Sequence, residues 1–326
     1  MNSISEKSAG ENRVWAVNVA TCFLHFTSAI AVIGLWTDWP VPVTTSYISW
    51  QLKNETSTDG CAENNCEVSM KFATFGKTEI SLLGLVLAFH FLSFSWQFLV
   101  LFPGPIQDRY YEGLANGTNA FRWIEYALSA PLMIVVIAAA LGQVDVVVYY
   151  LLMVNTSMLM GLGYLQEVHM RETTVPHMMG WVLFAATWVA PTFTFFTSLS
   201  QSAQKPPDDI LFIVYLTLFI QISLFGCFGI VQIVHVGQYH STIFNCLCNI
   251  GGRKRAPIYI CRPDKHDIHR PDIHMGEIKV HFTPQPGYYG IELAYGILSA
   301  TAKVSLAVLL ILLIRTRNKT LNLEFV

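Results

Sequence analysis

Seven long apolar runs constrain this chain more than any other feature of its sequence. Each run is long enough for the roughly 20 mostly apolar residues that a membrane-spanning helix needs. Turn-forming or polar segments such as Pro103-Gly104-Pro105 separate them. The pattern predicts an all-α integral membrane protein, a bundle of seven transmembrane helices within residues 15–314. The predicted spans are 15–36, 80–102, 120–141, 146–166, 178–199, 210–236 and 289–314.

The composition agrees with a chain surrounded by lipid. Hydrophobic residues make up 53% of the sequence and charged residues 13%, about half the share usual in soluble proteins. The formal net charge of −2 gives no reason to expect a nucleic-acid partner. The expected environment is the lipid bilayer.

The distribution of Lys and Arg predicts the orientation of the bundle. With the N-terminus in the cytoplasm, twelve Lys and Arg residues lie inside and seven outside, as the positive-inside rule favours. Residues 1–14 then form a cytoplasmic tail, 37–79 an extracellular loop, 237–288 a long cytoplasmic loop and 315–326 an extracellular tail.

The first extracellular loop carries two β-favouring stretches, at 41–50 and 67–75, which predict a small β-hairpin. Cys61 and Cys66 would lie near its tip in an oxidising compartment, where a disulfide can form. The spacing alone leaves that disulfide open.

The loop over 237–288 combines Cys246, Cys248 and Cys261 with several histidines and the basic triplet 253–255. Three interpretations compete: a zinc site, which lacks two clean ligand pairs; palmitoylation of the cysteines beside anionic lipid; and a solvated loop. We therefore predict no metal site.

Lys303 lies near the middle of the seventh span, where an ionised side chain costs about 2.5–3.5 kcal/mol on insertion scales. Glu125 in the third span is its natural partner, and Ser129 lies one helical turn further on the same face. One interpretation is a salt bridge that fixes helix packing. The other is chemical, because a lysine amine condenses with an aldehyde to a Schiff base, whose proton a carboxylate retains.

Two motifs resemble one known family. Arg122-Trp-Ile-Glu-Tyr-Ala-Leu-Ser-Ala130 is similar to the third-helix signature of heliorhodopsins, and Glu292-Leu-Ala-Tyr295 with Leu298-Ser-Ala-Thr-Ala-Lys303 is similar to their seventh-helix signature. The seven spans, the inverted orientation and the long first loop fit as well. A viral or algal member would fit, although the link between spans six and seven is longer than is usual in the family.

The resemblance implies all-trans retinal on Lys303 with Glu125 as counterion. It places Ser299 near the Schiff base, Ser129 near the counterion, and His25 and His90 in a polar pocket; Arg122 lies one turn before Glu125. It also implies a homodimer. The retinal ring needs an aromatic sleeve, for which the candidates are Trp188, Phe193, Phe225 and Phe228.

The expected function is light sensing with a slow photocycle, passed to an unknown cytoplasmic partner, and no enzymatic activity. Proton pumps of this kind carry carboxylates where this chain has Ser299 and Val136. Transport stays an alternative, since Glu292, Glu79 or Glu167 could serve as proton donors. Two retinal-free alternatives are a seven-helix receptor and a membrane hydrolase with a zinc ion on His25, His90 and His169.

Overall fold

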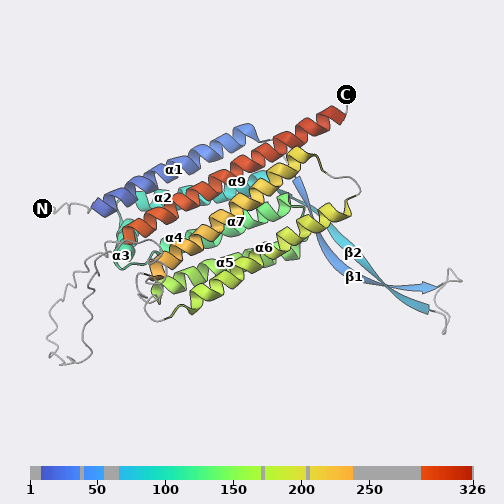
Figure 1. The fold of residues 1–326 in the computed structure, drawn as a ribbon, viewed down its shortest axis with the longest axis horizontal. Helices are drawn as coiled ribbons and strands as arrows, with labels where there is room; N and C mark the ends of the chain where they lie inside the picture. The colour runs from blue at the N-terminus through green and yellow to red at the C-terminus, as the bar shows by residue number, and fades with distance from the viewer. Residues whose placement is uncertain are drawn as a thin grey trace, which may run out of the picture.

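The computed structural model describes residues 9–36, 40–54, 66–169, 173–202, 206–237 and 288–324. Seven of its helices are long and apolar enough to cross a membrane, which confirms the predicted bundle. They run side by side with nearly parallel axes (Figure 1). These helices are α1 (Ala9–Leu35), α2 (Leu82–Leu101), α4 (Ala120–Ala140), α5 (Val146–Val168), α6 (Val175–Gln201), α7 (Asp208–Gly237) and α9 (Tyr288–Glu324).

Polar side chains begin several of these helices where the apolar runs begin. Ser81 Oγ accepts a hydrogen bond from the backbone N–H of Gly84 at the start of α2, and Asp145 Oδ1 accepts one from Val147 at the start of α5. Such caps satisfy amide groups that have no partner inside the helix. The last helix, α9, continues ten residues past the predicted end at 314, to Glu324.

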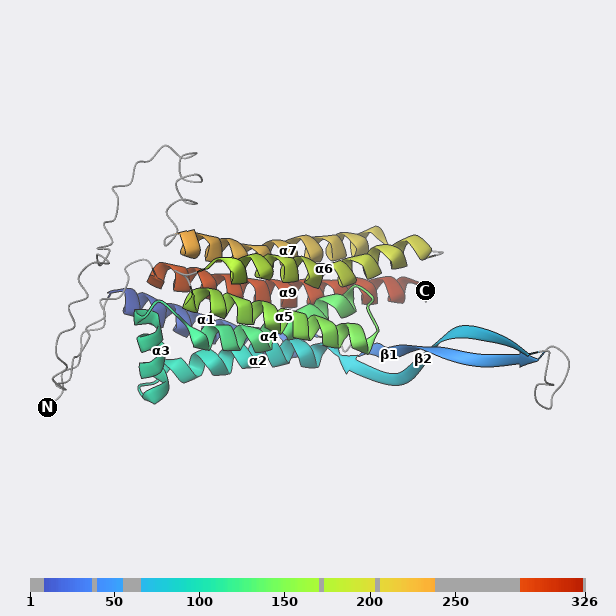
Figure 2. The ribbon, with the colours of Figure 1, turned by 90° about the horizontal axis from the view of Figure 1, so that it is seen from below.

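A short helix, α3 (Pro105–Ala115), was not predicted. It begins at Pro105, a favoured residue for the first helical turn, and it lies across one end of the bundle (Figure 2). Its buried Tyr110 and Leu114 pack with Val14, Val100 and other apolar residues of the helix ends. We call this end of the bundle the α3 end.

A two-stranded antiparallel sheet confirms the predicted hairpin. Strand β1 (Pro40–Asn54) pairs with β2 (Cys66–Ser81), and the ribbon extends well beyond the helices at the opposite end, which we call the hairpin end (Figure 2). The backbone N–H of Thr44 donates to the carbonyl of Val144 at 2.8 Å, which ties the hairpin to the turn between α4 and α5.

Some predictions fall outside the described residues. These include the disulfide partner Cys61 and the whole of 238–287, with Cys246, Cys248 and Cys261.

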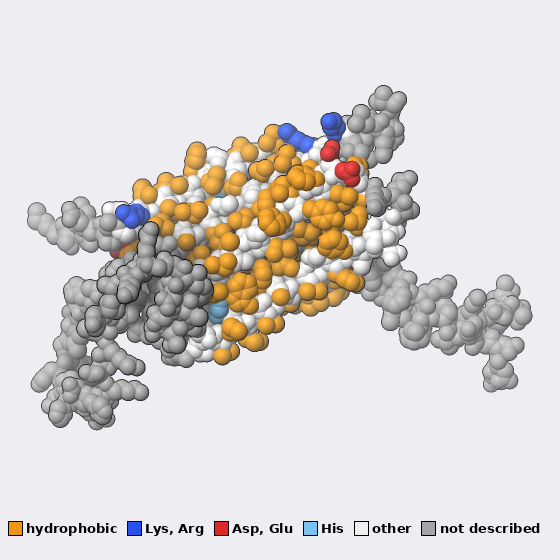
Figure 3. Space-filling view, viewed as in Figure 1, with side chains coloured by type: hydrophobic (Ala, Val, Ile, Leu, Met, Phe, Trp, Pro, Cys, Tyr) orange, Lys and Arg blue, Asp and Glu red, His pale blue; other side chains and the backbone are white. Residues whose placement is uncertain are grey.

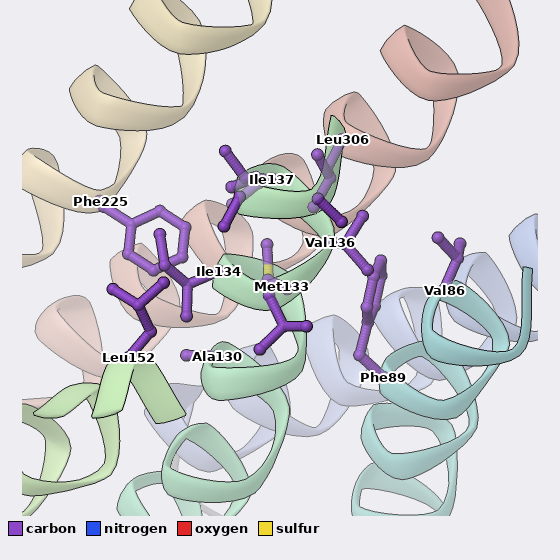
Figure 4. Packing of buried hydrophobic residues seen from close by; sticks show 14 of the residues in the cluster. Val86, Phe89, Ala130, Met133, Ile134, Val136, Ile137, Leu152, Phe225 and Leu306 are labelled. Carbon is purple, nitrogen blue, oxygen red and sulfur yellow. The ribbon is translucent and has the colours of Figure 1, made fainter. Parts of the chain in front are cut away.

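The core is built around α4. Met133, Ile134, Val136 and Ile137 of α4 are buried, and neighbouring helices contribute Phe89, Leu152, Phe225 and Leu306 around them (Figure 4). Apolar side chains cover the middle of the outer face, whereas the charged groups visible there lie towards the ends (Figure 3). Because lipid tails are as apolar as these residues, close packing and internal polar contacts hold the helices together.

Candidate functional site

Lys303 of α9 and Glu125 of α4 form a buried ion pair in the middle of the bundle. The ammonium nitrogen of Lys303 donates to Glu125 Oε1, and the two residues are only 2% and 6% exposed. Both side chains are buried away from the surface of the bundle, so each charge needs the other for compensation.

Ser93 of α2 completes this pair. Its hydroxyl donates to Glu125 Oε1 at 2.5 Å and accepts from Lys303 Nζ at 2.6 Å. Ser93 is fully buried, and sequence reasoning did not identify it. A serine inside an apolar run carries no signal of its own, since serines in membrane helices commonly bond to their own backbone.

The two serines named from the motifs both line the cavity that begins at Lys303. Ser129 Oγ donates to Glu125 Oε1 at 3.2 Å, so this oxygen accepts three hydrogen bonds. Ser299, one turn before Lys303, is buried and lines the adjoining cavity. The Lys303 nitrogen also lies 5.5 Å from the centre of the Tyr126 ring, within the range of a cation–π interaction.

An aromatic cavity begins at Lys303 and runs between α4, α5, α6, α7 and α9. It contains about 780 Å³ of space not filled by protein atoms, including the part that opens outwards. Phe225 and Phe228, two of the aromatic candidates from the sequence, line it. Trp188 stands against Phe225, with ring centres 5.8 Å apart, and is not among the lining residues. Phe193 is 68% exposed and points away.

Two glycines shape this cavity, and sequence reasoning missed both. A Cβ at Gly163 would overlap the indole ring of Trp123, and a Cβ at Gly229 would lie 2.6 Å from Trp181 Cζ2. Both indoles line the cavity. The absence of a side chain at these two positions therefore lets the tryptophan rings pack closely against α5 and α7.

The polar end of the cavity was also missed. His177 Nδ1 lies 3.1 Å from Gln232 Oε1, and the Trp181 indole N–H donates to His177 Nε2 at 2.9 Å. Both His177 and Gln232 line the cavity. The polar groups of His177, Gln232 and Trp181 thus bond to one another. They therefore do not require a polar ligand.

His25 of α1 and His90 of α2 are brought together, as the resemblance implied. Their Nδ1 atoms lie 3.2 Å apart, both side chains are fully buried, and neither Nε2 has a partner among the described residues. His169 follows the last residue of α5. No group of three potential metal ligands occurs within the described ranges, so the zinc set of the hydrolase alternative is not assembled there.

Arg122 lies apart from the Lys303 pair, in a second buried polar cluster. Its two terminal nitrogens donate to Glu167 of α5 and Glu292 of α9, and Asn119 Nδ2 donates to Glu292 Oε1 at 2.7 Å. The guanidinium carbon lies 4.1 Å from the ring centre of Tyr295. The sequence identified all three charged residues but not that they form one cluster.

A comparison of the sequence with models of protein families decides which family the chain belongs to. The family model described as Heliorhodopsin matches residues 14–246, which is more than half of the chain. The chain belongs to the heliorhodopsin family. Membership supports a retinal-binding, light-responsive membrane protein that crosses the bilayer several times.

The family match covers the helices that supply Ser93 and Glu125 and ends before Lys303, so the bundle geometry alone places α9 beside them. Among solved structures, the crystal structure of a thermophilic rhodopsin is similar at 12% identity over 93% of each chain, with a TM-score of 0.47. No curated protein sequence matches this heliorhodopsin.

Proposed function

We propose that this heliorhodopsin is a light sensor that carries all-trans retinal on Lys303. The observation that carries the proposal is the position of a buried lysine amine at the mouth of an aromatic cavity, hydrogen-bonded to a buried carboxylate. Retinal is an elongated apolar aldehyde, which suits an aromatic cavity with an amine at one end. Bound there as a Schiff base, it would supply light absorption and a double bond that isomerises.

The residues around Lys303 hold and balance one positive charge. Glu125 supplies the negative charge, while Ser93 and Ser129 fix its oxygen by donating to it. The surrounding low-polarity bundle strengthens these contacts relative to water. A change in the position of the nitrogen would therefore alter the proton balance of the whole group.

Colour tests this proposal directly. Protein produced in cells supplied with retinal should absorb visible light, and Lys303→Ala should abolish that band. Lys319→Ala, an exposed lysine on the same helix, is the matched control and should keep it. A colourless unsubstituted protein, or a coloured Lys303→Ala protein with covalently bound retinal, would refute the attachment site.

The residues at two positions of the sequence favour signalling over transport. Ser299 and Val136 stand where proton pumps of this kind carry carboxylates, and Val136 is fully buried among apolar residues. We expect a slow photocycle in flash spectroscopy and no sustained current under voltage clamp. A sustained photocurrent would favour the transport alternative, for which a polar cavity beside Glu125 is the specific observation.

The proposal also covers the orientation of the bundle in the membrane and its oligomeric state. The α3 end would face the cytoplasm and a signalling partner, and the hairpin end would face outside, as the Lys and Arg count predicts. The protein would act as a homodimer. Protease protection of an epitope at each terminus in sealed vesicles tests the orientation, and a protected C-terminus in cytoplasm-out vesicles is the expected result.

A further inference from the structure

The Arg122 cluster contains more buried negative charge than positive charge. Arg122 contributes one positive charge, while Glu167 and Glu292 contribute two negative charges when both are ionised. His235 Nδ1, 4.0 Å from Glu167 Oε1, adds a positive charge only when its imidazole is protonated. The remaining titratable neighbours are the phenols of Tyr110, Tyr126, Tyr288 and Tyr295. Because an uncompensated buried charge is costly, one extra proton would neutralise the cluster.

The hydrogen bonds distinguish the two carboxylates. Glu167 accepts from Arg122, from the Trp123 indole N–H at 2.8 Å and from the backbone N–H of Asn119 at 3.1 Å. Each of these three donors, one of them charged, favours the carboxylate form of Glu167. Within the described ranges Glu292 accepts from two donors, Arg122 and Asn119. Glu292 is therefore the better place for a proton.

A polar cavity lies between Glu292 and Glu125. It has a volume of about 40 Å³ and is lined by both carboxylates as well as by Asn119 and Ser299. At roughly 10–15 Å³ for each water, this is space for about three molecules.

Buried polar atoms of the residues that line this cavity also indicate that it holds water. Trp96 and Gln97 line it, and the buried Trp96 indole nitrogen and Gln97 amide oxygen have no hydrogen-bond partner within the described part of the chain. Buried polar atoms in native proteins are nearly always hydrogen-bonded, to ordered water if not to protein. Water at these atoms would form a hydrogen-bonded chain between Glu292 and Glu125.

We propose that Glu292 is a buried proton-binding site that holds one proton at rest and exchanges it with Glu125 through water in this cavity. In the exchange, the O–H bond of the Glu292 carboxylic acid breaks, and an O–H bond forms on the Glu125 carboxylate at the other end of the water chain. The inference goes beyond the proposed function, because the proton is held whether or not a chromophore is attached to Lys303.

Infrared spectroscopy of the protein purified without retinal tests the site. At neutral pH we expect a carboxylic-acid carbonyl band that is lost in Glu292→Gln and kept in Glu112→Gln, an exposed glutamate of α3 at the same end. Glu292→Asp guards against a folding failure, since it should keep an acid band at a shifted frequency. Absence of the band from the unsubstituted protein, or its survival in Glu292→Gln, would overturn the proposal.

Exchange with Glu125 has its own readout in the same retinal-free protein. Glu125→Gln removes a negative charge at the far end of the cavity, so the Glu292 band should disappear at a lower pH, by about one pH unit for two interacting sites. An unmoved titration of the band would show that the two carboxylates are not linked. Because colour plays no part in these measurements, their failure is distinguishable from the failure of the proposed function.

Discussion

Ser93→Ala removes the one hydroxyl that bonds to both members of the Lys303–Glu125 pair. In the unsubstituted protein that hydroxyl donates to the carboxylate at 2.5 Å and accepts from the amine at 2.6 Å. Its loss favours a protonated Glu125 and a neutral nitrogen, because a hydrogen bond to the charged form of a group favours that form. The colour change caused by acid should therefore move to higher pH.

The size of the shift follows from the strength of such a bond. A hydrogen bond to a charged group contributes about 1.5–3 kcal/mol, and about 1.36 kcal/mol corresponds to one pH unit. The loss amounts to roughly one to two pH units. We expect the lower value, because Ser129 still donates to the same carboxylate oxygen.

The assay is an absorption titration of the retinal-loaded protein from neutral to acid pH. Ser157→Ala is the matched control, since Ser157 is a bundle serine that donates to the backbone carbonyl of Ala127 at 3.0 Å and has no charged partner among the described residues. If the acid transition of Ser93→Ala coincides with that of the unsubstituted protein, the hydroxyl does not stabilise the carboxylate and this reasoning is refuted.

Three further predictions concern other parts of the site. Glu125→Gln should shift the visible band and let the Schiff base lose its proton at lower pH, since its counter-charge is gone; an unchanged alkaline colour titration would contradict this. Gly163→Ala should push the Trp123 indole into the cavity and weaken retinal binding, and it should cost about 1–3 kcal/mol of folding stability as in other overpacked cores, whereas Gly161→Ala meets no neighbouring atom and should bind retinal normally. Arg122→Gln should lower the thermal unfolding midpoint, because two buried carboxylates lose their shared cation at a cost of about 3–5 kcal/mol; an equal midpoint would mean that the cluster does not stabilise the fold.

Hydropathy predicted the bundle because each span is a local property of about twenty consecutive residues. The seven helices and the hairpin follow from length, apolar content and alternation, none of which needs long-range information. The short helix α3 escaped detection for the same reason. It has eleven residues, too few for a span, and Pro103-Gly104-Pro105 before it resembles a simple break.

The site was predictable only where a motif or an unusual charge marked it. Lys303 and Glu125 were found because charges in apolar runs need a reason. Ser93 was not, because its role exists only where α2, α4 and α9 meet. Likewise, the sequence placed Arg122 one turn before Glu125 but gave no sign that it pairs with two carboxylates from α5 and α9. Such pairings depend on how the helices are arranged, which a single sequence does not encode locally.

The residues that line the aromatic cavity were also only partly predictable from the sequence. Gly163 and Gly229 read as ordinary small residues of membrane helices, and only the packed bundle shows that each faces an indole ring. Aromatic residues occur throughout the spans, so the sequence could propose Phe225 and Phe228 but could not separate them from Phe193 on the outer face.

Chemical trapping of the chromophore bond tests the central claim most directly. Borohydride reduction of the coloured protein would fix any imine as a stable amine, and mass spectrometry of its peptides would locate the added group. We predict a single retinyl group, carried by the peptide that contains Lys303. A retinyl group on a different lysine, or complete recovery of the Lys303 peptide without one, would contradict the account.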